Sequence, residues 1–296
     1  MSLRAVRPAA SSRASAARRT IALLLNRLVL IAACLLTLFP AIWVFAASFS
    51  QGTSLYSGGL IPAKTTLANY AQLFFRDGHL GGTDFLLWMK NSLIICIPAS
   101  LLAVGLTTTM AYAFSRFHFV GRRFGLLALI LIQMFPAIMS IIALFRLLQV
   151  LSLLDQYLGL ILVYGCGNIG FNTWLLRGYL ESIPKDLEEA AYIDGATYWQ
   201  AFTKIVLPMA TPMLVVVFFF NFIGFFQEYL LASIIIFRPV LRPIALGMRF
   251  YINGKYSQNW TGFSAASIVA SLPILIIFFA LQKFIVEGLT KGALKG

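Results

Sequence analysis

Residues 182–208 read SIPKDLEEAAYIDGATYWQAFTKIVLP and form the most acidic segment between the long apolar runs of the chain. It lies between two long apolar runs. Half of the ten acidic residues of the chain nevertheless fall in it or just before it: Glu181, Asp186, Glu188, Glu189 and Asp194. Random scatter is a poor explanation for so much negative charge in one place. We therefore interpret residues 177–208 as a polar loop with a specific role between two membrane helices.

Local signals predict two short helices joined by a turn in this loop. Ser182 is placed to cap the first helix, Pro184 suits its opening turn, and the acidic residues favour the positive end of its dipole. Gly195 is placed to end it, because glycine tolerates the left-handed conformation that follows many helices. Thr197 and Gln200 have the spacing of a capping box and predict the start of the second helix.

The first of these helices carries small side chains on one face. Leu187, Ala190, Ala191 and Asp194 lie close together at helical spacing. The alternative is an amphipathic helix lying on the membrane, but such helices usually present Lys and Arg to anionic lipid. An acidic helix is repelled by the cytoplasmic leaflet and is better suited to a protein partner.

The chain on either side of the loop has the composition of a membrane protein. Of its 296 residues, 60% are hydrophobic and only 11% are charged. A membrane-crossing helix needs about 20 mostly apolar residues. Six stretches qualify: 28–49, 92–114, 124–147, 157–176, 209–237 and 263–284. We predict an all-α integral membrane protein of about six transmembrane helices, with the glycine- and asparagine-rich fourth helix inside the bundle.

The basic residues predict the orientation of these helices. With the N-terminus in the cytoplasm, fifteen of the 23 Lys and Arg residues fall in cytoplasmic segments, in line with the positive charge that such loops collect. Both termini are then cytoplasmic. The net charge of +13 is spread between apolar runs and not gathered on one folded face, which argues against nucleic acid as a partner.

The domain organisation follows from these segments. We expect a basic cytoplasmic tail at 1–27, disordered before residue 20, and a first helix at 28–49 followed by an external loop at 50–91. A five-helix core at 92–284 includes the cytoplasmic loop 177–208 and an external loop 238–261. A cytoplasmic tail follows at 285–296, where glycines permit an extended backbone.

One pattern in the loop resembles a known family. The segment EAAYIDGATYWQAFTKIVLP at 189–208 contains EAA, three residues, G, nine residues, I, any residue and LP. It is similar to the signature of the permease subunits of bacterial ATP-binding-cassette importers, of the type I fold, where it forms a coupling helix that sits in a cleft of the ATPase. The resemblance assigns ATPase coupling to Glu189, Ala190, Ala191, Asp194, Gly195, Ile205, Leu207 and Pro208. Proline at 208 also marks the expected start of the next membrane helix.

Other segments resemble one branch of that family, the smaller permease subunit of maltose and maltodextrin importers. They are AYAFSRFHFVG at 111–121, QMFPAIMS at 133–140 and GLTKGALKG at 288–296. The resemblance implies a multi-pass protein of the bacterial cytoplasmic (inner) membrane, surrounded by lipid. It implies as partners a homodimer of ATPase subunits, a second, larger permease subunit and an extracytoplasmic solute-binding protein. The implied substrate is a maltodextrin-type sugar, with another carbohydrate as the alternative, and the tail at 288–296 is expected to dock between the ATPase subunits.

The chain itself carries no motif for catalysis or metal binding. A nucleotide site needs a phosphate loop of the form GxxxxGK[ST], but the Gly-Lys pair at 254–255 is followed by Tyr and lacks the preceding glycine. Cys34, Cys96 and Cys166 have neither CxxC spacing nor a neighbouring His. We expect a transporter subunit without catalytic residues, metal or cofactor, served by a separate ATPase.

Polar residues within the apolar spans are candidate contacts for the solute, because ionisable groups in a membrane normally face the bundle interior or a cavity. They are Asn221, Gln227 and Glu228 in the fifth span, Gln133 in the third, and Asn168 and Asn172 in the fourth. Glu228 either lines the pathway or pairs with a partner chain. For the asparagines, hydrogen bonds between helices are the competing explanation.

The external loop 238–261 contains YINGKYSQNW at 251–260. Aromatic faces and amide donors suit a sugar-bearing cleft or a protein contact, whereas an aromatic belt at the membrane interface is the alternative. In the family resembled, the equivalent loop enters the cleft of the binding protein. We therefore expect Tyr251, Asn253, Gly254 and Tyr256 to contact the solute-binding protein.

Two other classes of protein compete with this interpretation. Ion-driven secondary transporters usually carry internal repeats and coupling-ion residues at mid-membrane, whereas this sequence shows no repeat and one mid-span carboxylate. A membrane-anchored structural protein has no need of an acidic loop with this spacing. Dependence of solute uptake on ATP and an added ATPase separates the three classes.

Overall fold

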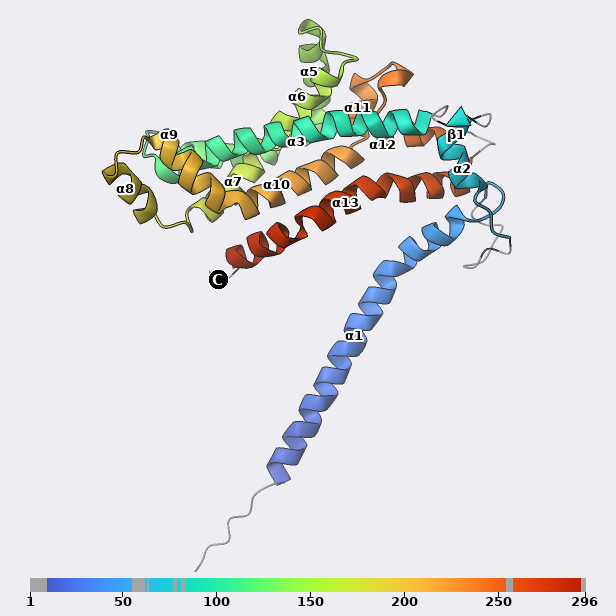
Figure 1. Cartoon of the computed structure of the whole chain (residues 1–296), viewed down its shortest axis with the longest axis horizontal. Coiled ribbons are helices and arrows are strands. Elements are labelled where there is room, and N and C mark those ends of the chain that lie inside the picture. The colour runs from blue at the N-terminus through green and yellow to red at the C-terminus, as the bar shows by residue number, and fades with distance from the viewer. Residues whose placement is uncertain are drawn as a thin grey trace, which may run out of the picture.

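A computed structural model describes residues 10–54, 62, 64–76, 79–80, 84–253 and 258–293. Over these residues the protein is a bundle of long helices with a small hairpin at one end (Figure 1). The long or membrane-core helices are α1 Ala10–Ser48, α3 Asp84–Arg116, α4 Arg122–Gln133, α5 Ala137–Val150, α6 Tyr157–Gly167, α7 Ile169–Leu180, α10 Leu207–Gln227 and α13 Trp260–Ala293. The shorter elements are α2 Ala68–Phe74, β1 Phe75–Arg76, β2 His79–Leu80, α8 Asp186–Ile193, α9 Tyr198–Ala201, η2 Phe202–Val206, α11 Leu230–Ile235, η3 Pro239–Leu241, α12 Ile244–Gly247 and η4 Met248–Tyr251. The antiparallel strands pair Phe75 with Leu80 and Arg76 with His79.

Among the described residues, four helices are long and apolar enough to cross a membrane. They contain the segments Arg19–Ser48, Asp84–Arg116, Tyr198–Gln227 and Trp260–Val286. Two bent pairs, α4 with α5 and α6 with α7, raise the number to six if each pair is one span. The prediction of an all-helical membrane protein with about six spans is confirmed.

The third and fourth spans are not the unbroken helices expected from the sequence. α4 ends at Gln133 and α5 starts at Ala137, and their axes differ by 100°. Pro136 explains this break, since it has no backbone N–H and disfavours helical geometry in the residue before it. α6 and α7 bend by 47° at Asn168, directly after Gly167, where the lack of a side chain weakens the helix.

Three expected boundaries are wrong. The backbone is already helical from Ala10, so the described part of the N-terminal tail is not disordered; its alanines favour a helix. The fifth span ends at Gln227 and not at 237, because Glu228 is extended and a separate helix follows. α13 continues to Ala293, so the C-terminal tail is helical and not extended over most of its length; residues 294–296 lie outside the description.

α3 lies at the centre of the bundle and packs against α6, α7 and α10. Two groups of buried side chains form the core. The group nearer α2 includes Phe85, Ile95 and Phe222, and the group nearer α8 includes Leu180 and Val206. The two groups lie toward opposite ends of α3, so this helix connects them.

A π-helical turn, η2, lies where the polar loop enters the membrane span. It joins α9 to α10 without a break, and the N–H of Leu207 donates to the carbonyl of Phe202, five residues earlier. Pro208 cannot donate and would clash with the carbonyl four residues before it in a regular α-helix. The wider turn relieves this clash. Pro208 lies in the first turn of α10, as the sequence predicts, and α10 continues α9 and η2 in one helical span from Tyr198 to Gln227.

α1 stands apart from the rest of the bundle (Figure 1). Its C-terminal end packs against α13, while every side chain from 19 to 45 is exposed. An apolar helix with so little cover in its own chain must be surrounded by lipid or by another subunit.

Close backbone contact fixes the start of α6. A Cβ atom added to Gly159 would lie 2.3 Å from the carbonyl oxygen of Leu153. Leu153 belongs to a tight loop in which Ser152 and Asp155 have positive φ angles of 57° and 56°. The loop and the helix therefore approach each other more closely than any side chain at 159 permits.

We predict that Gly159→Ala lowers the thermal midpoint of the purified protein, by the equivalent of about 1–3 kcal/mol for overpacking. Gly167→Ala in the same helix is the matched control, because a Cβ there meets nothing within 4 Å. Equal midpoints for the two variants would contradict the close contact.

Candidate functional site

The polar loop folds as the turn signals predict. α8 ends in a Schellman motif: the N–H of Gly195 donates to the carbonyl of Tyr192 at 3.1 Å, and that of Ala196 to Ala191 at 2.9 Å. Gly195 has a φ of +84°, which confirms the predicted left-handed turn. The turn fixes the direction in which the chain leaves α8.

The capping box of α9 is also confirmed. The Oγ1 atom of Thr197 accepts the N–H of Gln200 at 3.2 Å, and the Gln200 side chain accepts the N–H of Thr197 at 2.8 Å. The expected cap of α8 is wrong, however. Ser182 donates to the carbonyl of Tyr179 at 2.7 Å, and Lys185 precedes the helix without a side-chain cap. Ser182 is used to close the end of α7 and is not available to α8.

A buried ion pair ties α8 to the centre of the bundle. Glu188 accepts from Nε of Arg116, the last residue of α3, at 2.5 Å, and from the hydroxyl of Tyr112 at 2.9 Å. The guanidinium of Arg116 also donates to the carbonyl of Ile183 at 3.1 Å. The Arg116 and Glu188 side chains are only 6% and 4% exposed. We call this group of four residues the α8 anchor.

The opposite side of the loop is open. Of the residues assigned to ATPase coupling, Glu189, Ala190, Asp194 and Gly195 are exposed, and Ala191 is half-buried. Large apolar side chains stand beside them: Ile193 is 87% exposed, Tyr198 65% and Trp199 67%. These three residues lie outside the signature and were not among the predicted coupling residues, although exposed apolar side chains beside acidic ones indicate a contact surface.

The remaining signature residues lie where the polar loop joins the membrane span. Ile205 and Leu207 are half-buried and Pro208 is exposed, in and directly after the π-helical turn. They belong to the same continuous helix as α10. The end of the polar loop and this membrane span are therefore parts of one continuous helix.

The polar residues of the spans are largely engaged with their own chain. Asn172 of α7 donates to the Oδ1 atom of Asn221 in α10 at 3.2 Å, and Asn221 donates to the carbonyl of Val217 at 2.8 Å. Both asparagines are buried. The first bond joins α7 to α10, and the second lies within α10. Asn168 marks the bend between α6 and α7 and is exposed.

Glu228 is held at the break between α10 and α11. Its carboxylate accepts from the N–H groups of Leu231 and Ala232 at 2.8 and 3.1 Å, which makes it a cap for α11. It also accepts from the hydroxyl of Tyr164 at 2.8 Å. The carboxylate of Glu228 is therefore hydrogen-bonded within its own chain and needs no partner chain for this.

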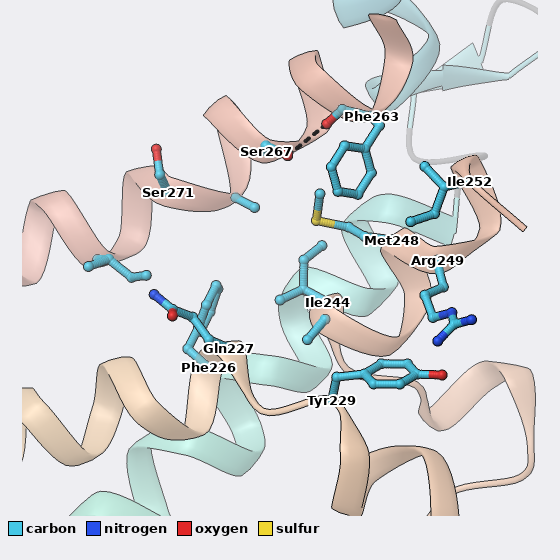
Figure 2. Close-up of a pocket in the computed structure, with 13 residues that line it drawn as sticks. Phe226, Gln227, Tyr229, Ile244, Met248, Arg249, Ile252, Phe263, Ser267 and Ser271 are labelled. Carbon is cyan, nitrogen blue, oxygen red and sulfur yellow. Dashed lines mark hydrogen bonds between the residues drawn. The ribbon is translucent and has the colours of Figure 1, made fainter. Parts of the chain in front are cut away.

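Gln227 lines a cavity of about 350 Å³ between the end of α10, the segment α12–η4 and α13 (Figure 2). Its walls are mainly apolar, with Ser267 and Ser271 contributed by α13. At one side the guanidinium of Arg249 lies 4.8 Å from the ring centre of Tyr229. An apolar pocket with a few polar groups is the usual form of a small-molecule site.

The predicted binding-protein loop is described only in part. The ring of Tyr251 packs edge-on against Trp88 of α3, with centroids 6.5 Å apart, and burial raises the pKa of its hydroxyl to about 12. Asn253 accepts from Arg249 at 3.2 Å and is exposed. Gly254 and Tyr256 lie outside the described residues.

A second charged contact closes the end of the bundle opposite α8. The carboxylate of Asp155 accepts from the N–H groups of Phe237 and Arg238 at 2.9 and 3.0 Å and pairs with the Arg238 guanidinium at 2.5 Å. Partial burial by itself would raise the pKa of Asp155, but these donors outweigh it and hold the pKa below its ordinary value. The contact joins the loop before α6 to the one after α11.

A helical bundle of apolar spans with one polar, anchored loop at its end is the architecture of a multi-pass membrane protein. Residues 102–291 match the family described as "binding-protein-dependent transport system inner membrane component", and the chain belongs to this family. The predicted class, a permease of an ATP-binding-cassette importer in the inner membrane, is confirmed. The ion-coupled alternative is not favoured.

Curated relatives extend over nearly the whole chain. It is 39% identical over 282 residues to the galactooligosaccharides transport system permease protein GanQ of Bacillus subtilis (strain 168), covering 94% of this chain and 98% of the relative. It is 36% identical to the maltose/maltodextrin transport system permease protein MalG of Escherichia coli (strain K12), covering 93% and 96%.

The fold agrees with a solved transporter. A chain of a bacterial ABC transporter involved in the import of the acidic polysaccharide alginate superimposes with a TM-score of 0.76. The match covers 95% of this chain and 100% of that chain at 24% identity. The predicted importer-permease fold is thereby confirmed.

We predict that Glu188→Ala lowers the thermal midpoint of the isolated chain strongly, because removal of one partner of a buried ion pair costs about 3–5 kcal/mol. Asp186→Ala in the same helix is the control, since Asp186 is exposed and within the described residues forms no ion pair. Arg116→Ala combined with Glu188→Ala is expected to cost less than the sum of the single changes. Additive losses would show that the two residues act independently.

The Asp155 contact predicts a dependence of stability on pH. A carboxyl group with a lowered folded-state pKa stabilises the fold fully above its unfolded pKa of about 4, and this contribution is lost as the pH falls through the lower, folded value. The difference in thermal midpoint between the wild type and Asp155→Asn should therefore shrink below about pH 4. A difference independent of pH would contradict an ionised Asp155.

Proposed function

We propose that the chain is the permease subunit through which an ATP-binding-cassette importer moves an oligosaccharide into the cytoplasm, with ATP hydrolysed by separate subunits. The observation that carries this proposal is the loop with all seven signature positions, exposed on one side and anchored in the bundle on the other. An exposed loop is sufficient to bind a partner. Because the α8 anchor joins this loop to α3, binding of the ATPase to the loop also moves the membrane helices.

The coupling surface consists of Glu189, Ala190, Asp194 and Gly195 together with the exposed apolar residues beside them. Small side chains allow a partner to approach the backbone, and aromatic residues commonly supply most of the binding energy at protein interfaces. This end of the bundle faces the cytoplasm, where the ATPase subunits, as a homodimer, engage it. The same placement puts both termini in the cytoplasm.

A second, larger permease completes the pathway. One chain of this shape leaves the long apolar face of α1 without cover (Figure 1), and a partner permease provides it. On the other side of the membrane, the loop 238–261 meets the solute-binding protein. Asn253 is accessible to this partner, and the packing of Tyr251 against Trp88 fixes the loop on α3.

The substrate class is a neutral oligosaccharide. Relatives with 36–39% identity carry the names of maltose/maltodextrin and galactooligosaccharide systems. The cavity that Gln227 lines supports a role for this residue on the pathway, whereas Asn221 and Glu228 shape the helices around it through their internal bonds. No nucleotide site is assigned to this chain, in keeping with the missing phosphate loop.

We predict that Gly195→Leu abolishes most ATP-dependent uptake. Leucine at a φ of +84° costs roughly 1–3 kcal/mol of backbone strain, enough to lower productive docking about 5- to 150-fold. Gly195→Asn is the matched control, since asparagine accepts this conformation. The assay is sugar uptake by proteoliposomes that contain the permease pair, the ATPase and the binding protein.

The same assay tests the function itself. Uptake must require ATP and the ATPase, and must persist when the proton and sodium gradients are collapsed. Normal uptake by Gly195→Leu with the ATPase bound would remove the coupling role. Uptake driven by an ion gradient alone would remove the proposed function.

A further inference from the structure

Three arginines converge on a cavity at the end of the bundle that carries α8. Arg122, Arg123 and Arg177 line a space of about 560 Å³ beside the first turn of α4. One carboxylate lies among them: Glu181 is 2.8 Å from Arg177 and 3.6 Å from Arg122. Three guanidinium groups against one carboxylate leave two positive charges without compensation.

The arginines differ in how they are held. Arg122 donates to the carbonyls of Phe114 and Ser115 at 2.8 and 3.4 Å, so it closes the end of α3. Arg177 is held by Glu181. The side chain of Arg123 forms no hydrogen bond or ion pair with any described residue and is exposed. It is therefore the guanidinium most free to bind a ligand.

The position of the cluster adds to its positive potential. Arg122 and Arg123 are the first two residues of α4, where the helix dipole is positive and cations are unfavourable. The first backbone N–H groups of a helix also lack intrahelical acceptors. A cluster of this kind is stabilised by an anion, and arginine forks fit phosphate oxygens in two-pronged fashion.

The surroundings of the cavity identify the source of the phosphate. α4 runs from the arginines with no buried residue, and its apolar side chains are open: Phe124 is 77% exposed, Leu127 49% and Leu131 63%. A soluble anion would leave these apolar side chains uncovered. A phospholipid fits both parts, with its headgroup among the arginines and its acyl chains along α4.

We propose that Arg122, Arg123 and Arg177 form a binding site for the phosphate headgroup of an anionic phospholipid in the cytoplasmic leaflet. The leaflet follows from the proposed orientation, but the site is defined by binding and not by transport. Because Arg122 and Glu181 also contact the ends of α3 and α7, the bound lipid holds the loop between α3 and α4 next to the α8 anchor.

The test measures lipid binding to the purified full chain by native mass spectrometry. Phosphatidylglycerol, zwitterionic phosphatidylcholine and inorganic phosphate are added separately. We expect phosphatidylglycerol to be retained in preference to the other two. Arg123→Gln should weaken its binding about tenfold, the effect of one charge-assisted hydrogen bond. Lys283→Gln, which removes one positive charge from the exposed surface of α13, should leave binding unchanged.

Each other outcome overturns the proposal. Equal loss in the two variants indicates a general effect of net charge. Equal retention of the two lipids removes the headgroup site, and binding of inorganic phosphate alone indicates a soluble anion. If Arg123→Gln weakens binding of the ATPase and not of phosphatidylglycerol, the cluster is a protein contact. ATP-driven uptake is measured in parallel, so loss of lipid selectivity with normal uptake refutes this site and not the proposed function.

Discussion

The buried ion pair between Arg116 and Glu188 is the contact on which the arrangement of the polar loop depends. Two charges withdrawn from water are stable only while they remain paired and hydrogen-bonded, and the Tyr112 hydroxyl supplies a further donor to the carboxylate. Arg116 is the last residue of α3, against which α6, α7 and α10 pack. A force applied to α8 is therefore resisted at the centre of the bundle and not absorbed by a flexible linker.

The prolines determine which membrane helices are continuous and which are bent. Pro136 separates α4 from α5, while Pro98 and Pro273 lie inside long helices that continue through them. Pro208 is accommodated by the π-helical turn before it. In a membrane the freed backbone groups must be satisfied within the protein. Continuous helices thus connect the loop to the opposite end of the bundle, and the breaks fall in the spans beside them.

Local signals made much of this structure predictable. The turn at Gly195 and the capping box at Thr197 depend on neighbouring residues, and the spans depend on length and composition. The anchor could not be found in this way, because Arg116 and Glu188 are 72 positions apart. Likewise, Asp155 and Arg238 are separated by 83 positions. The bend at Pro136 had a local signal, which the long apolar run around it concealed.

Two neighbouring carboxylates show why the loop works as a unit. Successive residues of an α-helix point about 100° apart, so Glu188 of α8 is buried against the end of α3 while Glu189 is exposed. The signature residue Glu189 contacts solvent because the buried Glu188 fixes the rotation of α8 about its axis. The same rotation leaves Ile193 exposed, with Tyr198 and Trp199 beside it on α9. The surface offered to a partner therefore extends beyond the signature itself, and its shape is set by a side chain that no partner can reach.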